Sequence, residues 1–345
     1  MLLSGLEQFV LDLGEPRFRA AQIASWVFEK GAASFEEMTN LPKLLRARLH
    51  DIARITTLRV VQQSHSRHSP TSKYLLGLDD GQTVETVLIG GVQRNTLCIS
   101  TQVGCALACR FCASGLAGLS RNMTAGEIVD QVIQVQRRVG DDRTINNVVL
   151  MGMGEPLANY DAVLRAVRII NAPWGLGIGA RKITISTSGL VPNILRLATE
   201  GLQVELSVSL HAADDDTRSF LMPINRRYPL RSLLDACTRY VETTNRLITF
   251  EYILLKDVND GLDDAGRLIA LLRDLLCKVN LIPYNPVDGL PFETPDEGRQ
   301  AAFLRVLQAG RITTTIRRER GRDIDAACGQ LRLKESGQRS VVGGR

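Results

Sequence analysis

The sequence lacks a long apolar run and an export signal. No apolar segment approaches the roughly 18 residues that a membrane-spanning helix requires. The first residues, MLLSG, lack the basic start and apolar stretch of a signal peptide. We therefore expect a cytoplasmic protein with no membrane partner. With 345 residues and 44% hydrophobic content, the chain is long enough for a substantial core and about two domains.

The sequence also lacks the even cysteine count of a full disulfide framework. Its seven cysteines, in a chain without an export signal, favour metal binding or thiol chemistry. The sequence also lacks a large net charge, because it contains 42 Lys and Arg residues and 37 Asp and Glu residues. The charge is uneven, however: residues 41–73 carry seven basic residues against one acidic residue, and residues 311–345 carry nine against four. Such stretches attract polyanions, although from the charge alone a solvated basic face is the favoured interpretation.

From about residue 83, strand-like runs alternate with amphipathic, helix-like segments. The runs are 96–100, 147–151, 182–187, 204–211, 248–255 and 278–284, and the helix-like segments are 125–139, 160–170, 191–200, 230–244, 265–276 and 295–309. Six alternations predict a parallel sheet with right-handed crossovers, in an open doubly wound sheet or a barrel. The first 75 residues contain no nucleotide-binding loop, and helical spacing at 18–28 and 41–52 predicts short helices there.

Polar and glycine-rich motifs follow four of the predicted strands. They are MGMGEP (151–156), STSG (186–189), SLH (209–211) and YNP (284–286). In barrel folds the chemistry lies at the carboxyl ends of the strands. The positions of these motifs therefore favour a barrel with one shared active-site mouth.

Three cysteines lie within eight residues, directly after the first of these strands. They are Cys105, Cys109 and Cys112. A structural zinc site or a ferredoxin-type cluster takes four protein ligands, and this loop has no fourth cysteine. Three thiolates on a 4Fe-4S cluster would leave one iron free to bind a chelating substrate.

The cysteine spacing, the aromatic Phe111 and the downstream Gly-Glu pair resemble the radical S-adenosylmethionine superfamily. More closely, three motifs are similar to the RlmN/Cfr family of RNA adenosine methyltransferases: CISTQVGCALACRFC (98–112), MGMGEPLAN (151–159) and DIDAACGQL (323–331). The resemblance implies a partial (β/α)6 TIM-like radical S-adenosylmethionine barrel at 91–321. It also implies a small helical, RNA-binding domain at 1–80 and a C-terminal segment at 322–345.

The resemblance implies a cofactor set and its contacts. Cys105, Cys109 and Cys112 would hold a 4Fe-4S cluster, and each turnover would use two molecules of S-adenosylmethionine. The residues that match the family's S-adenosylmethionine contacts are Gly154, Glu155, Ser186, Ser209, Leu210, His211 and Asn285. Taken singly, these residues are more simply explained as turn, capping or core residues; their joint position at strand ends favours a cofactor site.

Three further residues match the family's catalytic positions. Cys328 resembles a cysteine that is methylated and then loses a hydrogen atom to a radical, so that it carries the methyl group to adenine. Cys98 resembles a second thiol that helps to release the adduct and forms a transient disulfide, and Glu85 matches a proton acceptor. Without the resemblance, Cys328 would be a buried thiol and Glu85 an exposed strand glutamate. Cys237 and Cys277 lie in helix-like apolar stretches and are interpreted as packing residues.

The family resemblance implies an adenosine of 23S rRNA as substrate, together with the tRNA adenosine next to the anticodon. It also implies a reducing partner such as flavodoxin, and we expect a monomer. QVGC (102–105) and GEPL (154–157) look like the enzymes that methylate carbon 2. The alternatives are methylation of carbon 8, a radical enzyme acting on a peptide or small molecule, and a non-catalytic iron-sulfur or zinc protein that binds RNA.

Overall fold

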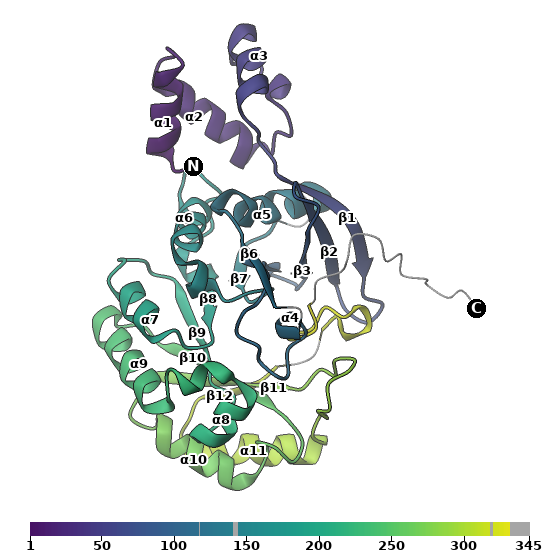
Figure 1. The fold of residues 1–345 in the computed structure, drawn as a ribbon, viewed down its shortest axis with the longest axis vertical. Helices are drawn as coiled ribbons and strands as arrows, with labels where there is room; N and C mark the ends of the chain where they lie inside the picture. Colours follow the sequence, from purple (N-terminus) through teal and green to yellow (C-terminus); the bar gives the residue numbers. More distant parts are fainter. Residues whose placement is uncertain (117, 141–143, 318–319, 332–345) are drawn as a thin grey trace, which may run out of the picture.

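The computed structural model describes residues 1–116, 118–140, 144–317 and 320–331. Figure 1 shows three N-terminal helices at one end of the molecule and a strongly curved sheet with helices around its outer surface. The helices are α1 (Leu3–Asp12), α2 (Phe18–Ala24), η1 (Ser25–Glu29), η2 (Phe35–Glu37), α3 (Lys43–Ile52), α4 (Ala113–Leu116), α5 (Ala125–Val139), η4 (Pro156–Asn159), α6 (Tyr160–Asn171), η5 (Ala180–Lys182), α7 (Val191–Ala198), α8 (Asp215–Leu221), η6 (Pro223–Arg226), α9 (Leu230–Thr244), α10 (Leu262–Leu272), α11 (Glu297–Ala309) and η7 (Arg322–Ile324). No helix within these residues is long and apolar enough to cross a membrane.

One ten-stranded sheet forms the framework, in the order β1-β2-β3-β4-β7-β8-β9-β10-β11-β12. Its strands are β1 (Leu58–His65), β2 (Thr71–Leu78), β3 (Thr83–Ile89), β4 (Thr96–Cys98), β7 (Asn147–Leu150), β8 (Ile183–Thr187), β9 (Glu205–Ser209), β10 (Ile248–Leu254), β11 (Cys277–Pro283) and β12 (Thr314–Ile316). The first four strands pair antiparallel, and every pair from β4 to β12 is parallel. A separate hairpin consists of β5 (Gln102–Gly104) and β6 (Leu119–Asn122).

The main core lies between the parallel strands and the outer helices. Alternate residues of each strand point outward into this core, as Phe250 and Tyr252 of β10 do. The residues between them point to the concave inner side of the sheet. Because all parallel strands run the same way, their carboxyl ends meet at one mouth, as the motif positions predict.

The predicted parallel strands and their helices are confirmed, with helix boundaries that match at α5 and α9 and differ by a few residues elsewhere. The expectation of short helices over the first 75 residues is correct only as far as Ile52. After that point β1 and β2 extend the sheet: β2 is buried along nearly its whole length between β1 and β3, and β1 is the mostly exposed edge strand. Cys277 is the first residue of β11, not part of a helix, and Cys237 is buried in α9.

Candidate active site

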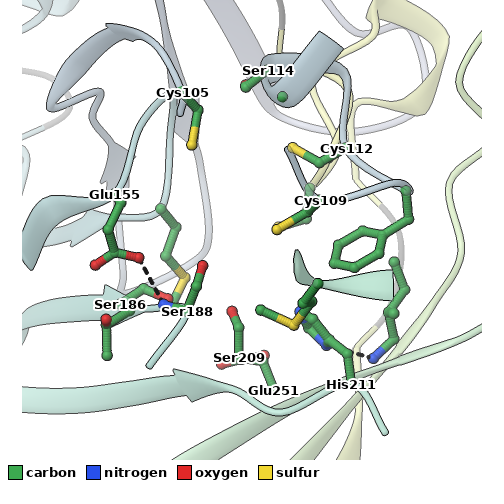
Figure 2. A pocket seen from close by; sticks show the side chains of 18 of the residues that line it. Cys105, Cys109, Cys112, Ser114, Glu155, Ser186, Ser188, Ser209, His211 and Glu251 are labelled. Carbon is green, nitrogen blue, oxygen red and sulfur yellow. Dashed lines mark hydrogen bonds between the residues drawn. The ribbon is translucent and has the colours of Figure 1, made fainter. Parts of the chain in front are cut away.

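The three loop cysteines lie between β5 and α4, at the mouth formed by the carboxyl ends of the strands. The hairpin of β5 and β6 fixes the start of the loop, because the backbone N–H of Cys105 donates to the carbonyl of Gly118 at 2.9 Å. Figure 2 shows the side chains of Cys105, Cys109 and Cys112 around one space. They line a cavity of about 150 Å³, which we call the cysteine cavity. The structure thus brings together the three residues that the sequence predicted as cluster ligands.

The donor set of this loop fits an iron-sulfur cluster better than a single metal ion. Among the described residues, no three Cys, His, Asp or Glu side chains converge on one ion position. A 4Fe-4S cluster is larger and takes its thiolates on separate iron atoms, so it suits thiols arranged around a cavity. Burial raises the pKa of Cys105 to about 11 and also raises the pKa values of Cys109 and Cys112. Bound iron would favour the thiolate forms.

Gly154 and Glu155 follow β7, and Figure 2 shows Glu155 across the cavity from Cys109 and Cys112. Gly154 has a φ of +95°, and a Cβ atom there would lie 2.4 Å from the Cβ of Gln102, so only glycine fits. The Glu155 carboxylate accepts hydrogen bonds from the backbone N–H groups of Leu157 at 3.0 Å and Ser188 at 2.7 Å. Burial raises the pKa of Glu155, and these hydrogen bonds oppose that shift. The carboxylate is therefore fixed where it could accept hydrogen bonds from an ammonium group.

Ser186 and Ser209 line the same cavity from the carboxyl ends of β8 and β9. Leu210 follows with a fully buried side chain, and its backbone N–H donates to the carbonyl of Glu251 at 3.0 Å. Leu210 therefore contributes its backbone position to the site. The two serines offer hydroxyl groups that could bind a polar cofactor.

His211 is held as a neutral ring. Its backbone has a φ of +59°, and its Nδ1 accepts a hydrogen bond from the backbone N–H of Ile253 at 3.1 Å. That acceptor role places the ring proton on Nε2. Burial lowers the pKa of His211 to about 3, and the nearby Arg218 adds to this shift. The ring packs edge-on against Phe111, with 4.8 Å between centroids, so it supports the cysteine loop from one side.

Cys328 lines the cysteine cavity together with the three loop cysteines, although it is more than two hundred residues away in the sequence. The backbone N–H of Ala113 donates to the carbonyl of Gly329 at 2.8 Å, which ties this C-terminal segment to the cysteine loop. Asn285 donates from Nδ2 to the carbonyl of Cys328 at 3.4 Å. The Asn285 Oδ1 atom is buried without a hydrogen-bond partner in the described residues, so it can accept one from a ligand.

Cys98 and Glu85 share one face of the sheet. Cys98 of β4 pairs with Val87 of β3, and Glu85 lies two residues before Val87. Burial raises the pKa of Cys98 to about 12, and electrostatic repulsion from Cys328 adds to this shift. All seven cysteines are free thiols in this structure.

Glu85 is 1% exposed, which corrects the view of an exposed strand glutamate that the residues alone suggest. Its Oε1 pairs with Lys73 Nζ at 3.1 Å, and Lys73 also donates to the carbonyl of Asp325 at 3.0 Å. Glu85 and Cys98 are not among the described residues that line the cavity, so the structure brings them beside the site but not into its wall.

Comparison with known proteins gives a consistent assignment. The Radical SAM superfamily model matches residues 99–269, and the model of the ribosomal RNA large subunit methyltransferase N-terminal domain matches residues 1–55. A probable dual-specificity RNA methyltransferase RlmN 3 from Opitutus terrae is 50% identical, over 99% of this chain and 95% of its own length. The dual-specificity RNA methyltransferase RlmN of Syntrophobacter fumaroxidans is 49% identical, over 95% of this chain and 96% of its own length.

The crystal structure of a radical SAM methyltransferase from Sphaerobacter thermophilus has a TM-score of 0.94 and 50% sequence identity to this chain. It covers 96% of this chain, and this chain covers 98% of it. The chain belongs to the RlmN family of radical SAM RNA methyltransferases. Membership of the radical SAM superfamily implies S-adenosylmethionine and a 4Fe-4S cluster as cofactors.

Two residues that sequence reasoning missed complete the site of this RlmN-family enzyme. Arg218 is 1% exposed, and its guanidinium donates to the carbonyls of Ser188, Ser209 and Leu210 at 2.9 to 3.1 Å. Glu251 is 6% exposed and lines the cavity from the inner face of β10. Neither residue belongs to a motif, and their only sequence signal is a charge within an otherwise apolar element.

Proposed function

We propose that this enzyme methylates carbon 2 of an adenosine in 23S rRNA, and of the tRNA adenosine next to the anticodon, through a methyl group carried on Cys328. The observation that carries this proposal is the position of Cys328 on the wall of the cysteine cavity, beside Cys105, Cys109 and Cys112. The printed names of the relatives, which describe dual-specificity RNA methyltransferases, support two kinds of RNA substrate.

Adenine itself supplies the chemical reason for a carrier. Carbon 2 of the ring is electrophilic, so a direct methyl transfer from an electrophilic sulfonium would join two electron-poor centres. The bound cluster and S-adenosylmethionine supply a 5'-deoxyadenosyl radical, and two molecules of S-adenosylmethionine are consumed per turnover. Cys328 first accepts a methyl group on Sγ, and its S-methyl group then loses a hydrogen atom, which leaves a carbon radical that adds to adenine.

Cys98 and Glu85 have proposed roles in the release of the product. The radical adduct on adenine would first lose its ring proton and one electron, which the oxidised cluster would take up, so that Cys328 and the base are joined through a thioether. Cys98 would then attack the sulfur of Cys328, so that a disulfide forms while the methylene carbon leaves with the base and takes up a proton. Burial keeps Cys98 in the thiol form, since it raises the pKa to about 12, and its activation therefore needs proton removal at that stage. Glu85 is the proposed acceptor of the adenine proton, and it would have to leave its ion pair with Lys73 to act.

Carbon 2 is preferred to carbon 8 on the residues around the cysteine loop. QVGC (102–105) and GEPL (154–157) look like the carbon 2 enzymes of the family. These two segments also touch in the structure, because the backbone N–H of Glu155 donates to Gln102 Oε1 at 2.8 Å.

The basic stretch at 41–73 agrees with a polyanionic RNA partner. We further propose a reducing protein such as flavodoxin as electron donor, a monomer and a cytoplasmic location. Residues 318–319 and 332–345 of the second basic stretch, at 311–345, lie outside the described residues.

The test is anaerobic reconstitution of the cluster, followed by reaction with S-adenosylmethionine, reductant and RNA. We expect mass spectrometry of the nucleosides to detect 2-methyladenosine. Cys328→Ala should reduce RNA methylation to background, whereas Cys277→Ala, which removes a thiol outside the cavity, should retain activity. 8-Methyladenosine as the main product would contradict the proposed position, and full activity of Cys328→Ala would contradict the carrier.

A further inference from the structure

A second, larger cavity lies on the concave inner side of the sheet, and we call it the inner cavity. Its volume is about 850 Å³, and inward-facing residues from β4 to β12 line it. Its charged lining residues are Arg94, Arg181, Lys278, Arg317, Arg320, Glu205 and Glu251. Cys328, Glu251 and Arg317 line both cavities. The proposed methyl carrier therefore stands where a cofactor on one side could meet a substrate on the other.

Glu251 is the buried acid at this junction, and Figure 2 shows it on the side of the cysteine cavity away from the three cysteines. Asn280 Nδ2 donates to its Oε2 at 2.7 Å, and Ser207 Oγ donates to its Oε1 at 3.3 Å. A carboxylate has about four lone-pair positions, so these two bonds leave acceptor capacity on both oxygens. Ser207 and Asn280 line the inner cavity and not the cysteine cavity, so the carboxyl group points toward the inner cavity.

The charge of Glu251 is incompletely compensated. No ion pair of the described residues includes Glu251 within the salt-bridge distance. Burial raises the pKa of Glu251, and the positive charges of Arg317 and Lys278 oppose this shift without contact. Each carboxyl oxygen already accepts one hydrogen bond from a described residue, and each keeps a lone pair for a further donor. The empty acceptor positions and the adjoining cavity together indicate a ligand with an N–H or O–H group.

We propose that Glu251 selects the target base by accepting a hydrogen bond from the exocyclic amino group of adenine. This inference rests on the proposed function and adds the residue that recognises the substrate. Adenine presents an amino donor next to a ring-nitrogen acceptor, which suits a carboxyl group with the Arg317 guanidinium beside it. Guanine presents the reverse pattern, a carbonyl acceptor and a ring N–H donor, so its carbonyl would face the carboxyl oxygens. The site thereby favours adenine over guanine.

The main rival ligand is the ribose of S-adenosylmethionine, whose hydroxyl groups also suit a carboxylate. Asn285 lines the inner cavity, but the other candidate contacts for that cofactor that line a cavity, among them Ser186, Ser209 and His211, line the cysteine cavity and not the inner cavity. Ser207 and Asn280, the hydrogen-bond partners of Glu251, line the inner cavity and not the cysteine cavity. Adenine is therefore a better match for the Glu251 carboxyl group than the ribose of S-adenosylmethionine. Binding of that ribose is kept as one outcome of the test.

The test compares two RNAs, one with adenosine and one with purine riboside, which lacks the amino group, at the target position. The value measured is kcat/KM for the adenosine RNA divided by kcat/KM for the purine riboside RNA. It is measured with reconstituted wild type and with Glu251→Gln. In the glutamine variant the amide oxygen accepts from Asn280 and the amide nitrogen takes the position of Oε1, so one of the two acceptor positions becomes a donor that opposes the amino group of adenine. We expect the ratio to fall about 10-fold or more, since a hydrogen bond to a charged group is lost. The intrinsic reactivity of the two rings cancels in this comparison.

Glu205→Gln is the matched control, because Glu205 also lines the inner cavity but pairs with Arg246. Its ratio should equal that of wild type. Glu251→Met, which removes the acceptor without adding a donor, repeats the test should the glutamine variant fail to hold its cluster. A ratio within about twofold of wild type in the Glu251 variants overturns the proposal, as does a raised KM for S-adenosylmethionine with unchanged base discrimination. If wild type methylates no adenosine, the proposed function is wrong and the role of Glu251 falls with it.

Discussion

At the scale of single residues, Arg218 joins the ends of two strands beside the cysteine loop. Its guanidinium also donates to Asn225 Oδ1 at 2.7 Å, so each of its nitrogens has a partner. Burial lowers the pKa of Arg218 to about 10, which still leaves the side chain charged at neutral pH. The positive charge lies near Cys109, where it favours the thiolate form of that cysteine. Arg218 is thus a positioning residue for the strand ends that carry Ser186 and Ser209.

Replacing Arg218 with methionine should therefore lower the free energy of unfolding by about 4 kcal/mol, because several buried carbonyl groups lose their donor. Urea unfolding of the reconstituted protein measures the change as a shift in midpoint. Arg231→Met removes an exposed arginine from α9 and should change the free energy of unfolding by less than about 0.5 kcal/mol. Arg218→Lys should recover part of the loss. Equal midpoints for the two methionine variants would contradict this role.

At the scale of elements, the turn after β7 must approach β5 closely for Glu155 to face the cysteines. Gly154→Ala would add a Cβ atom 2.4 Å from Gln102 Cβ at a φ of +95°, so the turn has to move. We expect a loss of about 3 kcal/mol in unfolding free energy, from backbone strain and overpacking, and weaker binding of S-adenosylmethionine. Calorimetric titration with the cofactor measures the second effect.

Gly126→Ala is the control for that substitution. Gly126 lies in α5 with ordinary helical geometry, and the nearest atom to an added Cβ is 3.8 Å away. Alanine there should leave cofactor binding unchanged and raise stability by up to about 1 kcal/mol, since it favours the helix. Unaltered cofactor binding by Gly154→Ala would show that the turn does not set the position of Glu155.

The sequence predicted the elements whose pattern is strong and periodic. Parallel strands that are largely buried, such as β10, and amphipathic helices such as α5 have clear signatures, so their type and order are correct. β1 was missed because most of its residues are exposed and its pairing with β2 is interrupted by a bulge between Val60 and Gln62. β12 has three residues, too few to show a period. The extension of the sheet is therefore set by tertiary pairing and not by local pattern.

The residues of the candidate site also divide into those with a local sequence signal and those that depend on tertiary neighbours. Cys105, Cys109 and Cys112 could be predicted because their spacing is a local feature, and Cys328 because its nine-residue motif resembles a known family. Glu251 could not be predicted, since its environment depends on Ser207 and Asn280 from neighbouring strands. Contacts between residues that are far apart in the sequence produce no local sequence pattern.

At the scale of the whole molecule, the N-terminal helices form a unit with its own small core, fixed to the barrel by polar contacts. Residues from Val10 to Leu49 make this core. Arg137 of α5 donates from Nε to the carbonyl of Gly31 at 2.6 Å, and the Asp130 carboxylate accepts from the backbone N–H groups of Thr57 and Leu58 at 2.8 Å. Neither α5 residue lines the cysteine cavity or the inner cavity, so these contacts leave both cavities free.

The basic stretch at 41–73 is expected to contribute to RNA binding, and this contribution can be measured. Its side chains Lys43, Arg59 and Arg67 are exposed, and Figure 1 shows α3 at the opposite end of the molecule from α9, α10 and α11. Replacing all three with glutamine should weaken RNA binding and reduce the slope of log Kd against log salt by about 2, since each phosphate contact releases close to one counterion. Fluorescence anisotropy at several salt concentrations gives that slope.

The matched control removes the same charge from the other end of the molecule. Arg239, Arg273 and Arg305 are exposed on or next to α9, α10 and α11, and their replacement by glutamine lowers the net charge equally. If RNA lies along the 41–73 stretch, this control keeps the slope of wild type, because unspecific attraction through net charge acts weakly beyond the ~10 Å Debye length. Equal reductions in both triple variants would mean that the net charge, and not the 41–73 stretch, governs binding of RNA.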